Sequence, residues 1–466
     1  MPHSTISTVS RQHEPPISLA RLTGILAVFT VVLVIGGTDM TKVAVALPEL
    51  TEQLSLGPVQ ALWVADAYAL TTGIAIIPSA VLADRYGRRR AYLAGLTVAM
   101  ASALLAGTAA DPTMLIIGRI GQGVGSALLI AATVAIIRVS FPTERSRAFA
   151  YGLWVSSFSA GVGLGPLLGG VLVEHLPWAW IFWVNAPVLG LCLLAAALVL
   201  PESRNAHPPG LDPFSIGSST IGIAALILAL KSMPRDDSVV IAPALLLGGA
   251  VALTAFCVRQ LRLRRPYLDV ALFKNPVLAV SALSIAATTG LFNGTLYLLT
   301  QQLQLVDERS GIEAGLVLLP LAAASVLGGV LSPGLKRWIS EPYLLISGFL
   351  CTASGALLLI SLPQTAHPAS LMLLGLGAGT VMAIASNALM SSAPTTRTAD
   401  AGAIQESAFA LGAGMGIATL GVLSLHFSAL DGDDLGIGIH SALGVGAFIY
   451  ACLAIPAALI SLARRR

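Results

Sequence analysis

The sequence is divided into fourteen apolar runs, each about as long as the roughly 20 residues that a helix needs to cross a bilayer. Only 11% of the residues are charged, whereas soluble domains carry about 25%. We therefore expect an all-α polytopic membrane protein. The runs cover about residues 22–47, 59–83, 91–110, 114–137, 149–173, 178–200, 214–230, 239–258, 276–300, 315–335, 343–362, 370–390, 402–427 and 441–462.

Basic residues gather in every second segment between these runs, beginning with the segment before the first run. Cytoplasmic loops of membrane proteins collect Lys and Arg. The pattern predicts a multi-pass protein of the cell (inner or plasma) membrane with both termini in the cytoplasm. Lys231, Arg235 and Arg309 are expected outside the spans on the other side.

Two segments set off the seventh and eighth runs from the others. Residues 202–213 are rich in Pro, and residues 259–274 form the longest basic segment. We therefore expect two six-helix bundles with two additional helices between them. The predicted divisions are a tail (1–21), an N-terminal bundle (22–200), a linker with two inserted helices (201–275), a C-terminal bundle (276–462) and a second tail (463–466).

Four charged residues, Asp39, Lys42, Asp66 and Arg119, fall inside apolar runs. Each costs at least about 2.5 to 3.5 kcal/mol in a bilayer unless it is paired or hydrated. At 1.5 Å per residue, Asp39, Asp66 and Arg119 reach one level in the outer half of the N-terminal bundle. Such residues indicate movement of protons or charged solutes. Lys42 follows Asp39 by three residues on one helical face, so we expect the two to pair.

Two further strings have a specific composition. The loop Leu82–Arg90 carries an acid at a helix end, a glycine suited to a tight turn and a basic cluster, namely Asp84, Arg85, Gly87 and Arg88. Basic residues alone would suffice to set topology. The fifth run has glycines four apart, which give a helix a smooth packing face, and a proline that permits a bend; its key residues are Gly161, Gly165, Pro166, Gly169 and Gly170.

These strings resemble signatures of the major facilitator superfamily. Residues 82–90 are similar to its G-x-L-A-D-R-x-G-R-K-R loop, with Ala80 in place of the first glycine. Residues 115–125 are similar to L-x-x-x-R-x-x-Q-G-x-G, and residues 161–170 to the G-x-x-x-G-P-x-x-G-G motif of antiporters. Residues 39–48, which read DMTKVAVALP, narrow the resemblance to fourteen-helix drug:H+ antiporters of the QacA type, which export quaternary ammonium compounds and dyes.

The resemblance implies a major facilitator fold and export of drugs or other toxic amphipathic compounds from the cytoplasm, in exchange for protons, by alternating access. An exporter of an endogenous metabolite or antibiotic is an alternative. A membrane-embedded sensor or enzyme is the alternative from another class, although no HExxH string or Ser/Lys arrangement favours it. The resemblance also implies conformational gating by the loop that contains Asp84.

We assign the charged residues four hypothetical roles. Asp39 is the principal proton site, and Asp66 is a second proton or cation site. Arg119 tunes both, unless it only bonds backbone carbonyls and holds helices together. Glu406, about four residues from the inner end of its run, is either a proton or substrate residue at the inner mouth or a solvated acid at a helix end. Pairing with Lys42 would disfavour dications at Asp39.

Five aromatic residues near the expected cavity are candidates to stack flat drugs or cations, although most membrane aromatics only pack or lie at the interface. They are Trp63, Tyr68, Trp154, Phe158 and Phe292. The sequence contains no GxxxxGK[ST] string, and its four cysteines form no CxxC pair. We expect no cofactor, metal site or nucleic-acid partner. The expected partners are protons, small amphipathic molecules and the bilayer, and the expected functional unit is a monomer.

Overall fold

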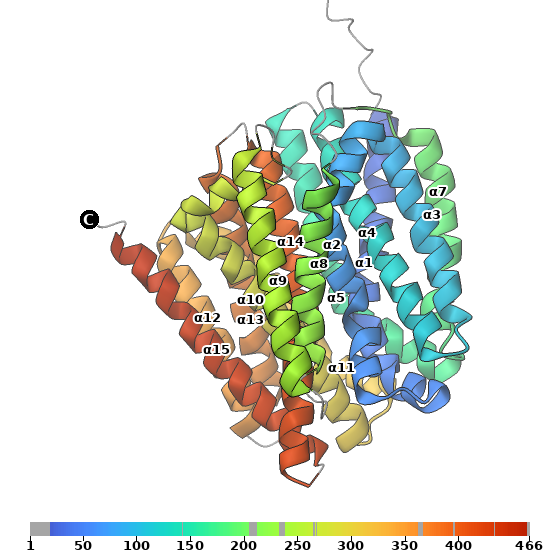
Figure 1. Cartoon of the computed structure of the whole chain (residues 1–466), viewed down its shortest axis with the longest axis vertical. Helices are drawn as coiled ribbons and strands as arrows, with labels where there is room; N and C mark the ends of the chain where they lie inside the picture. The colour runs from blue at the N-terminus through green and yellow to red at the C-terminus, as the bar shows by residue number, and fades with distance from the viewer. Residues whose placement is uncertain are drawn as a thin grey trace, which may run out of the picture.

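The computed structural model describes residues 19–141, 143–204, 212–232, 238–263, 266, 268–361, 367–394, 397–432 and 434–463. Throughout these residues the chain is helical or irregular, and fourteen helices are long and apolar enough to cross a membrane. The predicted number of spans is therefore confirmed. We call the side of the molecule on which α1 begins the termini side, and the other the far side (Figure 1).

The N-terminal bundle contains the first six spans. These are α1 (Leu19–Leu54), α2 (Pro58–Tyr86), α3 (Arg88–Gly107), α4 (Pro112–Ser140), α5 (Glu144–His175) and a sixth span made of α6 (Trp180–Trp183) and α7 (Asn185–Val199). Local chemistry sets several helix starts. Pro58 and Pro112 occupy first helical positions, where a missing N–H costs nothing. The Asp111 side chain caps α4 by accepting a hydrogen bond from the Met114 N–H.

The C-terminal bundle contains the last six spans. A short 3₁₀ helix, η1 (Val270–Lys274), leads into α10 (Pro276–Gln301), which continues as a π-helical turn, η2 (Gln302–Val306). The remaining helices are α11 (Gly311–Leu335), α12 (Glu341–Ser361), α13 (His367–Ser392), α14 (Thr398–Leu430) and α15 (Leu435–Ala463). A reciprocal capping box between Ser310 and Glu313 fixes the start of α11.

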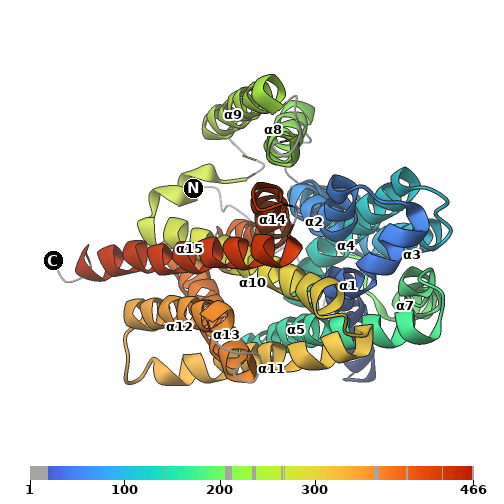
Figure 2. The same cartoon turned by 90° about the horizontal axis from the view of Figure 1, so that it is seen from below.

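The two inserted helices, α8 (Pro213–Ser232) and α9 (Ser238–Arg262), lie beside the bundles; α8 packs against α2 and α14, and α9 packs against α8 (Figure 2). On the termini side, Arg259 of α9 donates hydrogen bonds at 2.6 and 3.0 Å to Asp212, which directly precedes α8, and so links the two helices. These bonds lower the pKa of Asp212 to about 2. An acid whose pKa is lowered in the folded state stabilises the fold above about pH 4, and this stabilisation is lost as the pH falls toward 2. Asp212 therefore stays ionised and bonded to Arg259 over the physiological pH range.

Glycines on α5 determine how closely α1 packs. A Cβ at Gly161 would collide with the Val34 carbonyl, and one at Gly165 with the Thr41 hydroxyl. A Cβ at Gly169 would lie 2.6 Å from the Lys42 carbonyl oxygen. The contacts advance together along both helices, so α1 and α5 run parallel. The predicted glycine face is thus a packing surface for α1. Pro166 lies within the uninterrupted helix α5.

The two bundles meet in the half of the molecule that includes the far side. Gly170 and Pro166 of α5 lie against Gly311 and Gly315 of α11. On the other flank, α2 packs against α14 through three contacts, Leu62 with Gly421, Leu70 with Gly414 and Gly73 with Leu411. These close approaches hold the bundles together from the middle of the molecule to its far side.

Candidate functional site

Asp39 of α1 lies in a buried cluster with Lys42 and Asn185. The Lys42 ammonium nitrogen is 2.7 Å from Asp39 Oδ1, as the spacing of the two residues predicts. Asn185, at the start of α7, donates from Nδ2 to both carboxylate oxygens at 2.8 and 2.9 Å, and its Oδ1 accepts a hydrogen bond from Lys42 at 2.8 Å. The Asn185 amide thus contacts both charges, so α7 supplies hydrogen bonds to an ion pair that lies on α1.

Arg119 of α4 is fully buried and joins three helices. Its guanidinium donates to the Val64 carbonyl at 3.0 Å, to the Asp39 backbone carbonyl at 3.2 Å and to Gln122 Oε1 at 3.1 Å. Gln122 in turn lies 3.4 Å from Asp39 Oδ2. Arg119 therefore bonds backbone carbonyls, as one of the two sequence hypotheses states, and reaches the Asp39 carboxylate only through Gln122.

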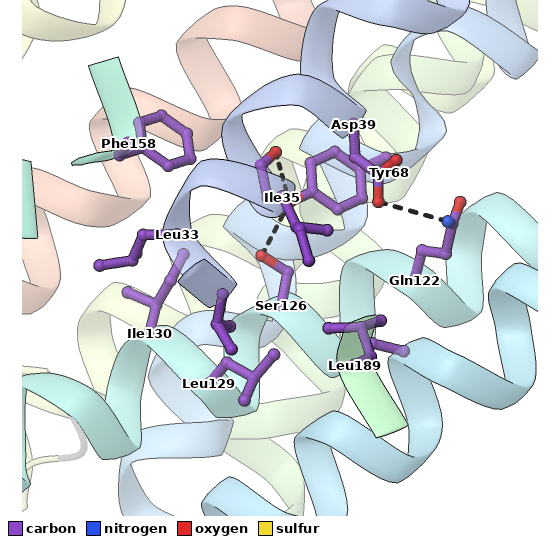
Figure 3. A pocket seen from close by; sticks show the side chains of 13 residues that line it. Leu33, Ile35, Asp39, Tyr68, Gln122, Ser126, Leu129, Ile130, Phe158 and Leu189 are labelled. Carbon is purple, nitrogen blue, oxygen red and sulfur yellow. Dashed lines mark hydrogen bonds between the residues drawn. The ribbon is translucent and has the colours of Figure 1, made fainter. Parts of the chain in front are cut away.

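A small cavity opens beside Asp39, walled mainly by apolar side chains of α1 and α4 (Figure 3). Its polar lining comes from Asp39, Tyr68, Gln122 and Ser126. The Tyr68 hydroxyl lies 3.0 Å from Ser126 Oγ and 3.2 Å from the Gly36 carbonyl oxygen. The cavity is too small for a drug-sized ligand, which needs about 300–1,000 Å³.

Phe158 lines this cavity and also reaches the other bundle. Its ring meets Phe409 of α14 edge-on, with 5.4 Å between the ring centroids. Asp39, Tyr68 and Phe158 thus lie together at this cavity. Lys42 does not line the cavity; it is fully buried, and its ammonium contacts Asp39 Oδ1 and Asn185 Oδ1.

Asp66 belongs to a separate cluster. Its Oδ1 is 2.7 Å from the ammonium nitrogen of Lys231, in the last turn of α8, and both side chains are almost completely buried. Lys231 also lies over the Trp63 ring. The prediction that Lys231 falls outside the spans was wrong, because its side chain finds a buried carboxylate that offsets the cost of leaving water.

The other predicted residues lie away from these clusters. Trp154 packs within the N-terminal bundle and Phe292 against the main hydrophobic core. Glu406 is partly buried two turns into α14, because that helix begins at Thr398 rather than near residue 402. Its predicted position near a helix end was therefore wrong.

The loop between α2 and α3 is held by its own motif and by the chain after α7. Asp84 pairs with Arg88 at 3.0 Å, while Arg85 is exposed. Gly87 has φ +117°, and a Cβ there would lie 2.5 Å from Glu202 Oε1. The Arg88 N–H donates to the Ser203 carbonyl at 3.0 Å. The positive φ angle thus favours glycine at this position, whereas the flexible Glu202 side chain could shift away from a Cβ.

Two residues of these clusters escaped the sequence reasoning. Asn185 is a lone amide within the sixth apolar run, and it is 146 positions from Asp39. Lys231 is separated from Asp66 by 165 positions and follows an apolar run at the point where a loop is expected. The available signals were a polar amide inside an apolar run and a lysine directly after one.

Comparison with known proteins places this geometry in context. A model of the Major Facilitator Superfamily matches residues 27–417. The multidrug efflux pump LfrA of Mycolicibacterium smegmatis is 33% identical over 86% of this chain and 81% of its own length. The methyl viologen resistance protein SmvA of Salmonella typhimurium is 30% identical over 87% of this chain and 83% of its own length.

Solved structures share the fold at lower identity. A bacterial homologue of the human lysosomal transporter Spinster superposes with a TM-score of 0.66 at 17% identity, covering 95% of this chain and 96% of its own. The human organic anion transporter MFSD10 also gives a TM-score of 0.66, at 15% identity, covering 95% of this chain and all of its own.

Proposed function

Because the chain belongs to the Major Facilitator Superfamily, we propose that it is a proton-coupled antiporter that exports drugs or other amphipathic compounds by alternating access. The relatives named as a multidrug efflux pump and a methyl viologen resistance protein support the substrate class. The observation that carries the proposal is the Asp39 carboxylate, which is buried between a cavity and the ammonium of Lys42.

The proposed cycle uses Asp39 as the principal proton site. A carboxylate that faces a small cavity can exchange a proton for another ligand when the cavity opens. Asn185 and Gln122 both contact this carboxylate and so hold it at the cavity wall. Arg119 orients the same region from its backbone side. Asp66 is the second proton or cation site, and Glu406 is a proton or substrate residue within α14.

The proposed topology places both termini in the cytoplasm, in keeping with the basic segments on that side. The far side is then the outer side of the membrane. The close approaches of α5 with α11 and of α2 with α14 close the pathway on that side in this conformation. We take the monomer to be the functional unit, since each bundle contributes half of the pathway.

Lys42 limits the charge of the substrate at Asp39. The Lys42 ammonium offsets the charge of the Asp39 carboxylate, so a dication finds less attraction here than at a free carboxylate. The site therefore has room for neutral, zwitterionic or anionic compounds. Lys42→Ile would expose the carboxylate and broaden transport toward dications.

The test uses protein reconstituted into liposomes that contain a pH-sensitive dye. Ethidium is added as the substrate, and the dye reports the protons that are released. The parent protein should release protons and transport ethidium, and Asp39→Asn should lose both by at least about tenfold. Gly152→Ala is the matched control, because nothing lies within 4 Å of the added Cβ. If Asp39→Asn retains proton release and transport, the assignment of Asp39 is wrong.

A further inference from the structure

The second buried ion pair joins the inserted helices to the N-terminal bundle. Lys231 belongs to α8, whereas Asp66 belongs to α2. Their charged atoms are 2.7 Å apart, and the side chains are 2% and 0% exposed. α8 also packs along α14 of the other bundle. A charge from outside the two bundles is therefore held inside the molecule at the seam where they meet.

The surroundings of the Lys231 ammonium are those of a cation-binding site. Trp63 precedes Asp66 by three residues, so both face the same side of α2. The ammonium nitrogen lies 3.7 Å from the centroid of the Trp63 ring. A carboxylate beside an aromatic face is a combination that binds organic ammonium ions. Lys231 thus makes the contacts that a bound cation would make.

The site has unused capacity on the carboxylate. Asp66 Oδ2 is buried and has no hydrogen-bond partner in the described structure. A buried polar atom without a partner is costly and calls for an explanation. A ligand broader than an ammonium group would reach this oxygen as well as Oδ1. The carboxylate therefore has one acceptor that Lys231 leaves unused.

We propose that Asp66 and the Trp63 ring form a binding site for an organic monocation, and that Lys231 occupies this site as a tethered competitor. The proposal rests on the proposed function only for the class of ligand. A tethered group acts at an effective concentration in the millimolar range, so it weakens the apparent affinity of a free cation. Binding of that cation displaces Lys231 and releases α8 from α2, which gives the inserted pair a regulatory role.

The experiment measures equilibrium binding of tetraphenylphosphonium to the purified full chain. Lys231→Met removes the competitor and should lower the Kd by about tenfold or more. Lys336→Met is the control, because this lysine pairs with Glu341 between α11 and α12; its Kd should match the parent. Adding Asp66→Asn or Trp63→Leu to Lys231→Met should abolish the gain.

Two results would overturn the proposal. One is an unchanged or higher Kd in Lys231→Met, and the other is a gain that persists when Asp66→Asn is added. If Lys231→Met does not fold, Lys231→Gln serves instead, because its amide keeps a donor for the buried Asp66 but removes the competing positive charge, and it should lower the Kd less than Lys231→Met. The measurement involves no proton gradient. A loss of proton-coupled export with a retained gain in binding would therefore refute the proposed function alone.

Discussion

At the residue scale, the site depends on how one amide serves two opposite charges. Asn185 donates to Asp39 and accepts from Lys42, so both members of the ion pair retain hydrogen bonds away from water. A buried pair with such support can persist, whereas removal of one member leaves a charge that nothing compensates. The stability of the cluster thus depends on the presence of both opposite charges, rather than on either charge alone.

This balance predicts a non-additive pair of substitutions. Lys42→Met alone should lower the free energy of unfolding by about 3–5 kcal/mol at pH 8, because it leaves the Asp39 charge unpaired. Asp39→Asn with Lys42→Met should recover most of that loss, since both charges are gone. Denaturant titration of the purified protein in mixed micelles would measure both values. Equal destabilisation of the single and double variants would contradict the account.

At the scale of single elements, α1 and α5 form one unit because glycine removes the side chains between them. Gly161, Gly165 and Gly169 lie on one face, and each allows an α1 backbone or hydroxyl group to approach. Close contact without side chains is the means by which membrane helices associate. Movements of Asp39 and Lys42 are therefore movements of α5 as well.

The close packing of α1 on α5 predicts different effects of two alanine substitutions in α5. Gly165→Ala should destabilise the protein by about 1–3 kcal/mol, because the new methyl group collides with Thr41 and overpacks the contact. Gly152→Ala should change stability by less than about 0.5 kcal/mol, as expected of a surface position. Thermal unfolding of both variants in detergent would compare their stabilities. Similar shifts in the unfolding temperature of the two variants would argue against close packing of α1 on α5.

At the scale of the whole molecule, the far side is closed by backbone contacts between the bundles. A Cβ at Gly170 would collide with the Gly311 carbonyl, so a side chain at this position cannot be accommodated while α5 and α11 stay together. Overpacking of about 1–3 kcal/mol corresponds to a shift of about 5- to 150-fold in a two-state equilibrium. Gly170→Leu should therefore favour a conformation open on the far side.

Distances between spin labels would detect that shift. Labels at Glu174, at the end of α5, and Val306, before α11, in a background without the native cysteines should give a longer-distance population in Gly170→Leu than in the parent. Gly248→Leu is the control, because its Cβ would meet nothing within 4 Å. Unchanged distances in a folded Gly170→Leu protein would show that the contact does not control opening.

Local features of this molecule were predictable from sequence, whereas distant pairings were not. Asp39 and Lys42 share a helix, so their three-residue spacing predicts their contact. The spacing of the glycines likewise predicts a packing face, although not that α1 covers it. Lys231 and Asn185 reach their partners only through tertiary packing, and periodicity within a single run carries no information about which run lies beside it. Glu406 was misplaced because helix ends extend beyond the apolar residues that reveal them.

The pairing of the buried charges has an electrical consequence. Lys42 and Lys231 offset Asp39 and Asp66 within the membrane-spanning region. A conformational change that moves both ion pairs across the membrane potential therefore involves no net electrical work on these pairs. An uncompensated charge would exchange about 2.3 kcal/mol per 100 mV of membrane potential. In the proposed cycle, a proton on Asp39 leaves Lys42 uncompensated. The Asp39–Lys42 pair would then carry a net charge that responds to voltage in the proton-loaded transporter and none in the proton-free transporter.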